Sequence, residues 1–341
     1  MLMAKPNRIH RRHLIFKSIF MNLPEKKNFC PKCGEPVDKG WKLCPACEYP
    51  LISLVCPVCL KAVKEHWKRC PFCEAGLICS VCGNRLTADN NSCPSCNAGQ
   101  SMGSITLLTE PATSMEFVLV PGGTFMMGDT FGVGLENEQP IHEVSIDNFY
   151  IGRYQVTQEQ WKKMMPENPS QFLGDQRPVE SVGFEAVLDF AKRLTAANQG
   201  QFIFMLPTEA QWEYAARSGG RNEKYSGGDG FEKLAWCEEN SINATNPVGK
   251  KSPNGLGLYD MSGNVWEWCR DYFMETAYRL HDNINPICDK EGSDRVIRGG
   301  GWNTDAWSVR CARRFGFPSQ YFGSALGFRL VLLKQPASET I

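Results

Sequence analysis

Apolar and polar residues alternate in short runs between residues 116 and 150, a pattern typical of strands with one buried face. The runs are Phe117 to Val120, Thr124 to Met127 and Val144 to Tyr150. Pro121-Gly122-Gly123 separates the first two runs and predicts a turn between them. The alternation therefore predicts a small sheet at the start of this region.

A helical period follows further along the chain. Residues 184–197 have apolar side chains at spacings of three and four, so we expect a helix that packs on the sheet. The pattern T-x-x-Q occurs at 157–160 and at 208–211, where it has the form of a capping box and predicts two helix starts. The large aromatic residues of these two helices are expected in the core: Trp161, Trp212 and Tyr214.

The last stretch breaks both patterns. An apolar and basic run leads into Gly299-Gly300-Gly301, and a strand signal from Gly327 to Leu332 closes the stretch. The roughly two dozen residues between these ends follow neither period, and connections of that length are usually functional. We therefore expect a binding surface here, held in place by the preceding part of the domain.

The charge is distributed unevenly along the chain. The 341 residues are 42% hydrophobic and have a formal net charge of zero, yet residues 1–100 contain 15 Lys and Arg against 7 Asp and Glu. The first hundred residues are thus +8 and the remainder is −8. Such asymmetry would ordinarily suggest nucleic acid or an anionic membrane. No segment has the length and apolarity of a membrane span, so we expect no membrane partner.

Cysteine spacing changes that expectation. Twelve of the 16 cysteines form three C-x2-C-x10-C-x2-C units, and four thiolates from two tight turns are the ligands of a structural zinc ribbon. The alternative is a disulfide framework, but no secretory signal accompanies the cysteines. The predicted zinc ligands are Cys30, Cys33, Cys44 and Cys47, then Cys56, Cys59, Cys70 and Cys73, then Cys79, Cys82, Cys93 and Cys96.

Zinc also alters the charge of this region. Four thiolates around one Zn²⁺ carry a formal charge of about −2, so three loaded sites would take residues 21–100 from +3 to about −3. The ribbons are then no basic patch, which favours a protein partner over nucleic acid. Reduced zinc thiolates also favour the cytoplasm as the compartment.

These features divide the chain into consecutive parts. Met21 is an alternative start, directly ahead of the first ribbon. The predicted parts are a basic tail at 1–29, ribbons at 30–47, 56–73 and 79–96, a linker at 97–115, a large domain at 116–334 and a short tail at 335–341.

The large domain resembles a known family. Its blocks FVLVPGGTFMMGD, LPTEAQWEYAAR, NGLGLYDMSGNVWEWCRDYF, RVIRGGGW and GFRLVL are similar to those of formylglycine-generating enzymes, the sulfatase-modifying factors. The resemblance implies an α+β, C-type-lectin-like fold with little regular structure and long packed loops. It also implies an activity, because oxidase members convert a substrate cysteine with two thiolates that hold Cu(I).

The residues expected for that chemistry are missing here. The positions of the two copper cysteines are occupied by Thr304 and Val309, and Gly301 and Ala325 replace a serine and an asparagine of the family. The one cysteine nearby is Cys311, a candidate nucleophile that is expected instead to be a small buried side chain. We therefore expect neither copper nor catalysis, with an active formylglycine-generating oxidase or another modifying enzyme as the alternative.

The terminal stretch is also similar to the variable proteins of diversity-generating retroelements. Those proteins end in a comparable constant frame, here RGGGW, Ala306, Val309, Arg310, Ala312, Arg314, Pro318, Tyr321 and LGFRLV. Aromatic residues with small polar neighbours form adaptable binding surfaces, so we expect a protein or peptide ligand. The alternative is that the phenylalanines are core residues. The predicted ligand-binding residues are Trp302, Asn303, Asp305, Trp307, Phe315, Phe317, Gln320 and Phe322.

A calcium site is the remaining candidate. In the family, calcium lies near a GNxWEW segment, and the matching residues are Asn264, Glu267 and the carbonyl of Val265. Hard oxygen ligands from a loop suit Ca²⁺. The alternative is that Glu267 caps or pairs locally.

Overall fold

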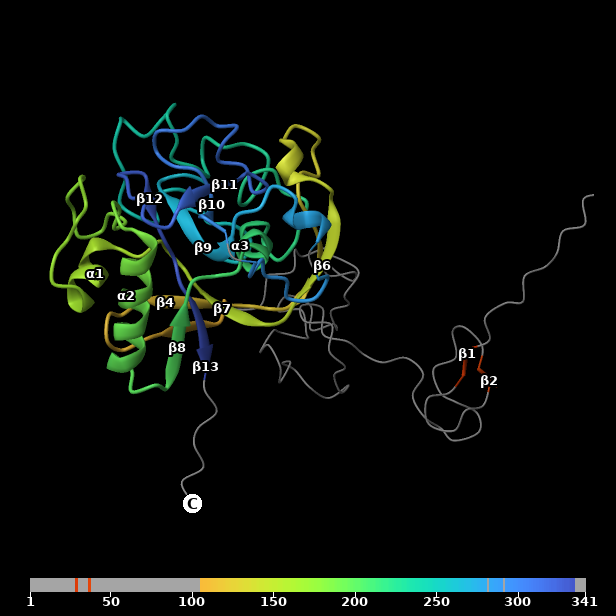
Figure 1. Ribbon diagram of the computed structural model, residues 1–341, viewed down its shortest axis with the longest axis horizontal. Coiled ribbons are helices and arrows are strands. Elements are labelled where there is room, and N and C mark those ends of the chain that lie inside the picture. The colour runs from red at the N-terminus through yellow and green to blue at the C-terminus, as the bar shows by residue number, and fades with distance from the viewer. Residues whose placement is uncertain (1–27, 30–35, 38–104, 281, 291, 335–341) are drawn as a thin grey trace, which may run out of the picture. The chain divides into compact units, whose positions relative to one another are not determined.

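The structure is a computed structural model that describes residues 28–29, 36–37, 105–280, 282–290 and 292–334 (Figure 1). The chain divides into two compact units at residue 53. Within the first unit the described part is an antiparallel pair of strands, β1 (Asn28–Phe29) and β2 (Pro36–Val37). The predicted zinc cysteines, residues 1–27 of the N-terminal tail and the tail at 335–341 lie outside the described residues.

The second unit contains a five-stranded sheet in the order β3-β4-β7-β13-β8. Every pair of neighbouring strands in it is antiparallel. The closing strand β13 therefore lies inside the sheet and ties the end of the domain to its beginning. The bounds are β3 (Leu107–Thr109), β4 (Glu116–Val120), β7 (Phe149–Gly152), β8 (Phe202–Met205) and β13 (Val331–Lys334).

A second sheet has the order β11-β10-β9-β12, and β5 pairs with β6 in a separate ribbon. The pair β9–β12 is parallel and the other pairs are antiparallel. The long loops of residues 218–265 and 299–313 gather at one side of this sheet (Figure 1). The bounds are β5 (Gly123–Met127), β6 (His142–Ile146), β9 (Trp266–Tyr272), β10 (Asp294–Arg298), β11 (Arg314–Pro318) and β12 (Leu326–Gly327).

The helices begin where the sequence predicts. The Thr157 and Thr208 hydroxyls accept hydrogen bonds from the backbone nitrogens of Gln160 and Gln211. The side chains of these glutamines accept in turn from the backbone nitrogens of the two threonines, so both capping boxes are confirmed. Helix α2 lies beside β8 (Figure 1). The bounds are α1 (Gln158–Met164), α2 (Phe184–Ala197) and α3 (Glu209–Ala216), with short 3₁₀ turns η1 (Glu136–Glu138) and η2 (Ala277–Arg279).

Two large apolar clusters form most of the core in the described part of this unit, and a smaller one contains Val309. Trp212 and Tyr214 belong to one and Trp161 to the other, and each of the three is at most 4% exposed, as expected. Mixed sheets with few helices agree with the α+β, C-type-lectin-like expectation. Among the described residues, none of the helices combines the length and apolarity that a membrane span requires.

The predicted strand from Val144 to Tyr150 is wrong as a single element. It ends at Ile146, and a new strand in a different sheet begins at Phe149. The side chain of Asn148 accepts from the Gly122 nitrogen at 2.7 Å, and the Asp147 nitrogen donates to the Asn285 side chain at 2.9 Å. At residues 147 and 148 these side-chain bonds replace the hydrogen bonds between strands, although apolar and polar residues continue to alternate there in the sequence.

Three further boundaries differ from the sequence prediction. Gly327 to Leu332 is not one strand, because residues 328–330 carry the chain from β12 in one sheet to β13 in the other. The stretch expected to lack regular structure contains β11, paired with β10 over its whole length. The predicted linker contains β3, which pairs with β4, so the folded domain begins before residue 116.

Candidate functional site

Arginines of the terminal stretch are buried and paired with carboxylates from distant elements. Arg310 donates to both oxygens of Glu138 at 2.8 and 2.9 Å. Arg314 donates to both oxygens of Glu209, at the start of α3, at 2.6 and 2.7 Å. All four side chains are at most 2% exposed. Bidentate pairs of this kind fix position and orientation together.

Two more arginines extend the same arrangement. Arg298, at the end of β10, pairs with Glu213 and also donates to the carbonyls of Ala312 and Cys311 at 2.9 and 2.8 Å. Arg329 donates to both oxygens of Glu267 at 2.6 and 2.7 Å. Buried ion pairs therefore hold the terminal stretch in place at four arginines along its length.

The turn into the stretch depends on glycine. Gly299 and Gly300 have φ of +95° and +74°, where a side chain is disfavoured. A Cβ on Gly300 would also lie 2.6 Å from Cγ1 of Val309. Val309 is buried, so the tight turn and the packed frame require each other.

The predicted ligand-binding residues are all at least partly exposed. Phe315 is 40% exposed and Phe322 is 65% exposed, which contradicts the core-aromatic alternative for these two. Asn303, Asp305 and Gln320 are exposed, while Trp302, Trp307 and Phe317 are half-buried. None of the eight predicted ligand-binding residues is buried.

The half-buried tryptophans are positioned by their ring nitrogens. Trp302 donates to the carbonyl of Ser324 at 2.9 Å, and its ring meets the edge of Phe172 with centroids 5.2 Å apart. Trp307 donates to the carbonyl of Val133 at 2.8 Å. Rings held in this way offer area to a ligand with little loss of side-chain entropy.

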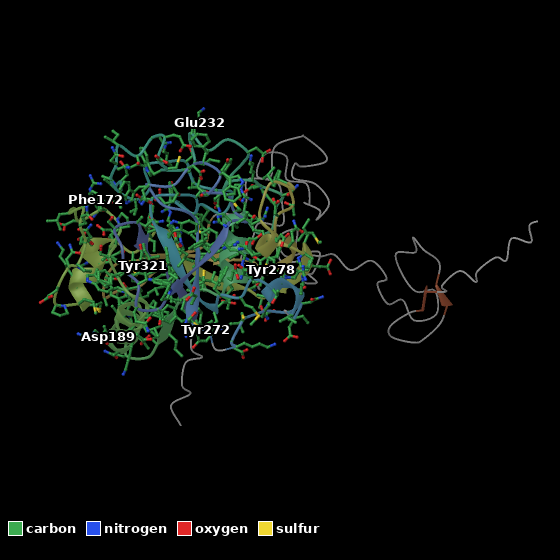
Figure 2. All side chains as sticks on the ribbon, turned by 45° about the horizontal axis from the view of Figure 1, so that its top comes forward. Phe172, Asp189, Glu232, Tyr272, Tyr278 and Tyr321 are labelled. Atoms are coloured by element: carbon green, nitrogen blue, oxygen red, sulfur yellow. The ribbon has the colours of Figure 1, made fainter. Side chains whose placement is uncertain are left out.

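An aromatic row runs along β11 and into the loop after it. Phe317 stacks on Tyr321 with centroids 4.0 Å apart, and Phe315 meets the edge of Phe317 at 5.3 Å. Tyr321, a position of the constant frame, is 42% exposed and covers one face of Phe317. Figure 2 labels Tyr321 and Phe172 among the domain's side chains.

Acidic side chains border this surface near Trp302. Glu238 donates its backbone nitrogen to the carbonyl of Thr304 at 2.9 Å, and the Glu239 side chain accepts from the Ala306 nitrogen at 3.0 Å. Glu238, Glu239 and Asp305 are exposed. We call Trp302, Asn303, Asp305, Trp307, Phe315, Phe317, Gln320, Tyr321 and Phe322 the terminal surface.

The positions that carry copper ligands in oxidase members have other contacts here. The Thr304 hydroxyl donates to the carbonyl of Gly301 at 2.9 Å, and Val309 is buried. Cys311 is fully buried, and burial raises the pKa of its thiol to about 12. A thiol so far from ionisation is a poor nucleophile.

The predicted calcium residues surround a side-chain amide. The Gln155 amide nitrogen lies 3.0 to 3.2 Å from the carbonyls of Asp260, Gly263 and Val265 and 3.0 Å from the Glu267 carboxylate. Asn264 donates to the Gln155 oxygen at 3.0 Å rather than directing its own oxygen to the same centre. An amide has two hydrogens for these four acceptors.

Asp260 is part of the same cluster. Its Oδ2 accepts from the Gly249 nitrogen at 2.8 Å, whereas its buried Oδ1 has no hydrogen-bond partner within the described part of the chain. Burial raises the pKa of Asp260 to about 6. Sequence reasoning missed Gln155 and Asp260 because they lie on either side of a packing contact that no local motif reveals.

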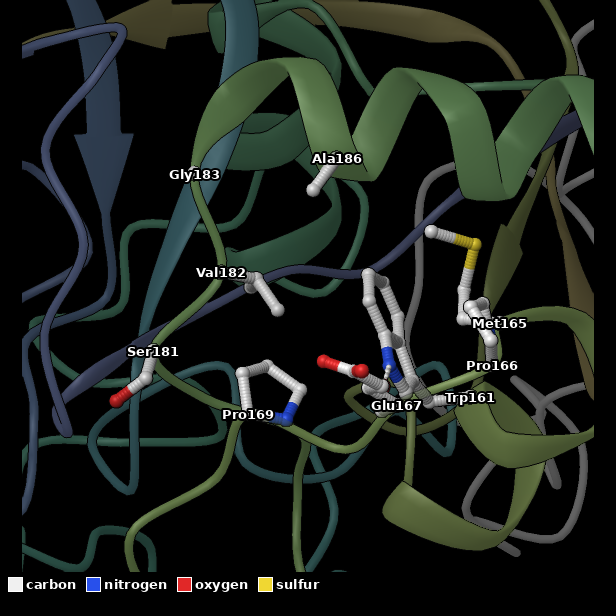
Figure 3. Close-up of a pocket in the computed structure, with 9 residues that line it drawn as sticks. All are labelled: Trp161, Met165, Pro166, Glu167, Pro169, Ser181, Val182, Gly183 and Ala186. Carbon is white, nitrogen blue, oxygen red and sulfur yellow. Dashed lines mark hydrogen bonds between the residues drawn. The ribbon is translucent and has the colours of Figure 1, made fainter.

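A cavity of about 250 Å³ opens between α1, the segment after it and the start of α2 (Figure 3). Its walls are mostly apolar, with Glu167 and Ser181 as the polar side chains. Sequence reasoning did not find this cavity. Its apolar lining is Trp161, Met165, Pro166, Pro169, Val182 and Ala186, together with Gly183.

Residues 106–334 match the family described as the sulfatase-modifying factor enzyme 1-like domain, which is about two thirds of the chain. The chain belongs to this family. Residues 24–74 also match the double zinc ribbon, so structural zinc and the first two predicted ribbons have independent support.

Relatives within the sulfatase-modifying factor family carry different names. The chain is 29% identical to the chaperone protein LppX of Paenibacillus barcinonensis over 65% of this chain and 90% of that protein. It is 28% identical to the formylglycine-generating enzyme of Streptomyces coelicolor over 64% of this chain and 90% of that enzyme. Family membership therefore leaves the activity to be argued from the site.

Among solved structures, variable protein 1 of Treponema denticola is similar over 67% of this chain and 99% of that chain, with 28% identity and a TM-score of 0.57. The sulfatase-modifying factor family and the C-type-lectin-like fold are thus both confirmed. The similarity also extends to a variable protein, as the terminal stretch suggested.

Proposed function

We propose that the family domain of this protein binds a protein or peptide ligand through the terminal surface and does not oxidise cysteine. One observation carries the proposal: the frame arginines are buried and paired, whereas none of the eight predicted ligand-binding residues is buried. Side chains that hold the backbone are thereby separated from side chains free to meet a partner. Rigid aromatic anchors with small polar neighbours suit such recognition.

The same separation favours a retroelement-diversified variable protein. Exposed positions can change without loss of the core, whereas the frame arginines cannot. The similarity to variable protein 1 of Treponema denticola is in line with this interpretation. A reverse-transcriptase gene and an imperfect repeat of the terminal coding region in the neighbouring DNA are the expected finding, and their absence would argue for an undiversified binder.

The rival function is the oxidase, and it has a direct test. A sulfatase-type peptide containing one cysteine is incubated with the full chain, Cu(I), oxygen and a thiol reductant, which supplies the two electrons that oxygen needs beyond those of the cysteine, and the product is read by mass spectrometry. We expect no formylglycine, because Thr304 and Val309 provide no thiolates and Cys311 is buried with a raised pKa. Turnover that disappears in Cys311→Ala would overturn the proposal.

The N-terminal part is proposed to hold three structural zinc ions and to contact a protein partner in the cytoplasm. The double zinc ribbon accounts for the first two sites. The third, at Cys79, Cys82, Cys93 and Cys96, rests on the same spacing and donor set. Zinc would fix these short segments, which contain too little apolar area to fold alone.

Calcium at Asn264, Val265 and Glu267 also remains a proposal. The oxygen cluster around Gln155 and the unpartnered Oδ1 of Asp260 support a cation, whereas the Glu267 ion pair with Arg329 competes for one ligand. Such an ion would be structural, because it would brace the loop beneath the terminal surface.

A further inference from the structure

The cavity of Figure 3 lies directly beside the terminal surface. The Ser181 nitrogen donates to the carbonyl of Gly323 at 3.0 Å, and the Phe184 nitrogen donates to the carbonyl of Ser319 at 3.1 Å. One wall of the cavity is therefore bonded to the loop that carries Tyr321 and Phe322. A ligand lying on that loop can extend a side chain into the cavity.

The lining selects for a particular side chain. The volume of about 250 Å³ suits one long side chain and is too small for a folded element. The walls are apolar, from the buried Trp161 ring to Val182 and Ala186. Figure 3 shows the Glu167 carboxylate between Pro169 and the Trp161 ring. An aliphatic stem ending in a cation fits walls and carboxylate together.

The charges around the cavity leave Glu167 available. The two lysines of α1 are engaged elsewhere, Lys162 with Asp175 at 2.5 Å and Lys163 with the carbonyl of Thr113 at 3.2 Å. Within residues 105–334 as described, Glu167 has no ion pair. Glu185, in the first turn of α2, offsets the positive end of that helix.

The rest of the binding face has the same sign. Glu238 and Glu239 are exposed beside Thr304 and Ala306, and the exposed Asp305 is itself part of the terminal surface. Residues 101–341 carry 22 Lys and Arg against 30 Asp and Glu. The negative charge of this face would therefore attract a partner that has basic side chains, both during its approach and once it is bound.

We propose that this cavity receives a single arginine or lysine side chain of the protein or peptide that binds the terminal surface. The inference rests on the proposed binding function and adds the ligand's chemistry: a basic residue adjacent to a segment that packs on Phe315, Tyr321 and Phe322. The stem lies along Trp161, and the charged group meets Glu167 at the mouth.

The test uses a phage-displayed library of random dodecapeptides, selected on the immobilised full-length protein with zinc present. Enriched peptides are synthesised and their Kd values measured against four variants of the same chain. Ala186→Phe fills the cavity, Glu167→Gln removes its charge, and the double variant Phe315→Ser, Phe322→Ser removes aromatic area from the terminal surface. Glu143→Gln removes an exposed charge on β6 and serves as the matched control.

We expect the peptides to share an arginine or lysine, to lose about tenfold in affinity for Ala186→Phe and about fivefold for Glu167→Gln, and to bind Glu143→Gln as they bind the parent. Peptides that need Phe315 and Phe322 but ignore both cavity variants would overturn this inference and leave the binding function in place. Peptides indifferent to all the variants, or no enrichment, would overturn both. Glu167 is exposed, so its variant tests the idea even if Ala186→Phe misfolds.

Discussion

Arg310 and Glu138 form a bidentate ion pair at 2.8 and 2.9 Å, although 172 residues separate them in the sequence. Asp129 lies 3.7 Å from the same guanidinium, and Arg313 lies 3.9 Å from the same glutamate. The pair joins the terminal stretch to the turn η1, and neither member reaches solvent. The terminal surface is thus held by contacts that its own sequence does not contain.

Breaking this pair on one side should be costly. Glu138→Gln leaves Arg310 buried with one lost charge partner, and we expect the free energy of unfolding to fall by about 3–5 kcal/mol. Urea denaturation followed by tryptophan fluorescence measures the change. Glu136→Gln, in the same turn, is the matched control. A loss below about 1 kcal/mol for Glu138→Gln would mean that the pair does not anchor the stretch.

Substitutions on the terminal surface should behave in the opposite manner. Phe322→Ser and Gln320→Ala remove exposed side chains, so we expect changes within about 0.5 kcal/mol. Val309→Ser places a hydroxyl in the core and should cost about 2–4 kcal/mol. Thermal unfolding of the three variants checks the contrast. Equal losses at Phe322 and Val309 would contradict the division into frame and exposed positions.

Metal removal should separate the two parts of the chain. We expect about three zinc ions per chain by atomic emission, and about two after Cys79→Ser with Cys82→Ser. EDTA should unfold the cysteine-rich segment, as read by protease sensitivity, because its fold depends on metal. The unfolding transition of the family domain should survive the same treatment. A preparation without zinc would refute the ribbon assignment.

A buried aspartate should make stability depend on pH. Burial, together with the nearby Glu209 carboxylate, raises the pKa of Asp271 from 3.8 to about 7. The folded state then holds a proton that the unfolded state releases above about pH 4, so this stabilisation is complete below pH 3.8 and is lost as the pH rises towards 7.

Asp271→Asn removes that titration. Relative to the parent, we expect the variant to gain about 1–3 kcal/mol between pH 4 and pH 7, on top of a constant offset from its altered hydrogen bonds. Chemical denaturation at several pH values measures the trend. Asp289→Asn, an exposed neighbour, should show no such trend. A flat difference between Asp271→Asn and the parent would show that Asp271 is ionised in the fold.

Calcium binding has a defined signature as well. If the proposed site binds the ion, millimolar Ca²⁺ should raise the melting temperature of the parent, and Gln155→Glu should strengthen the effect because it adds a carboxylate to four surrounding oxygens. Differential scanning calorimetry with Ca²⁺ and with EDTA makes the comparison. Identical melting curves for both proteins in both buffers would exclude the site.

Part of the fold was predictable because its causes are local. Thr157 and Thr208 cap their helices through bonds that span three residues, so the sequence pattern contains the whole interaction. The continuous alternation from Val144 to Tyr150 gave a wrong prediction of one strand, because the cause of the break is not local. Asn148 and Asn285 divide that run through partners up to 138 residues away, which periodicity cannot detect.

The sequence by itself determined the family, the zinc-ribbon spacing, the loss of the copper cysteines and the order of frame and intervening residues, because each depends on residue types at short separations. Only the tertiary structure decided which aromatics face solvent, which carboxylates receive Arg298, Arg310, Arg314 and Arg329, and that a cavity adjoins Tyr321. These depend on surfaces from segments far apart in the chain, whose meeting is fixed by packing rather than by any local pattern.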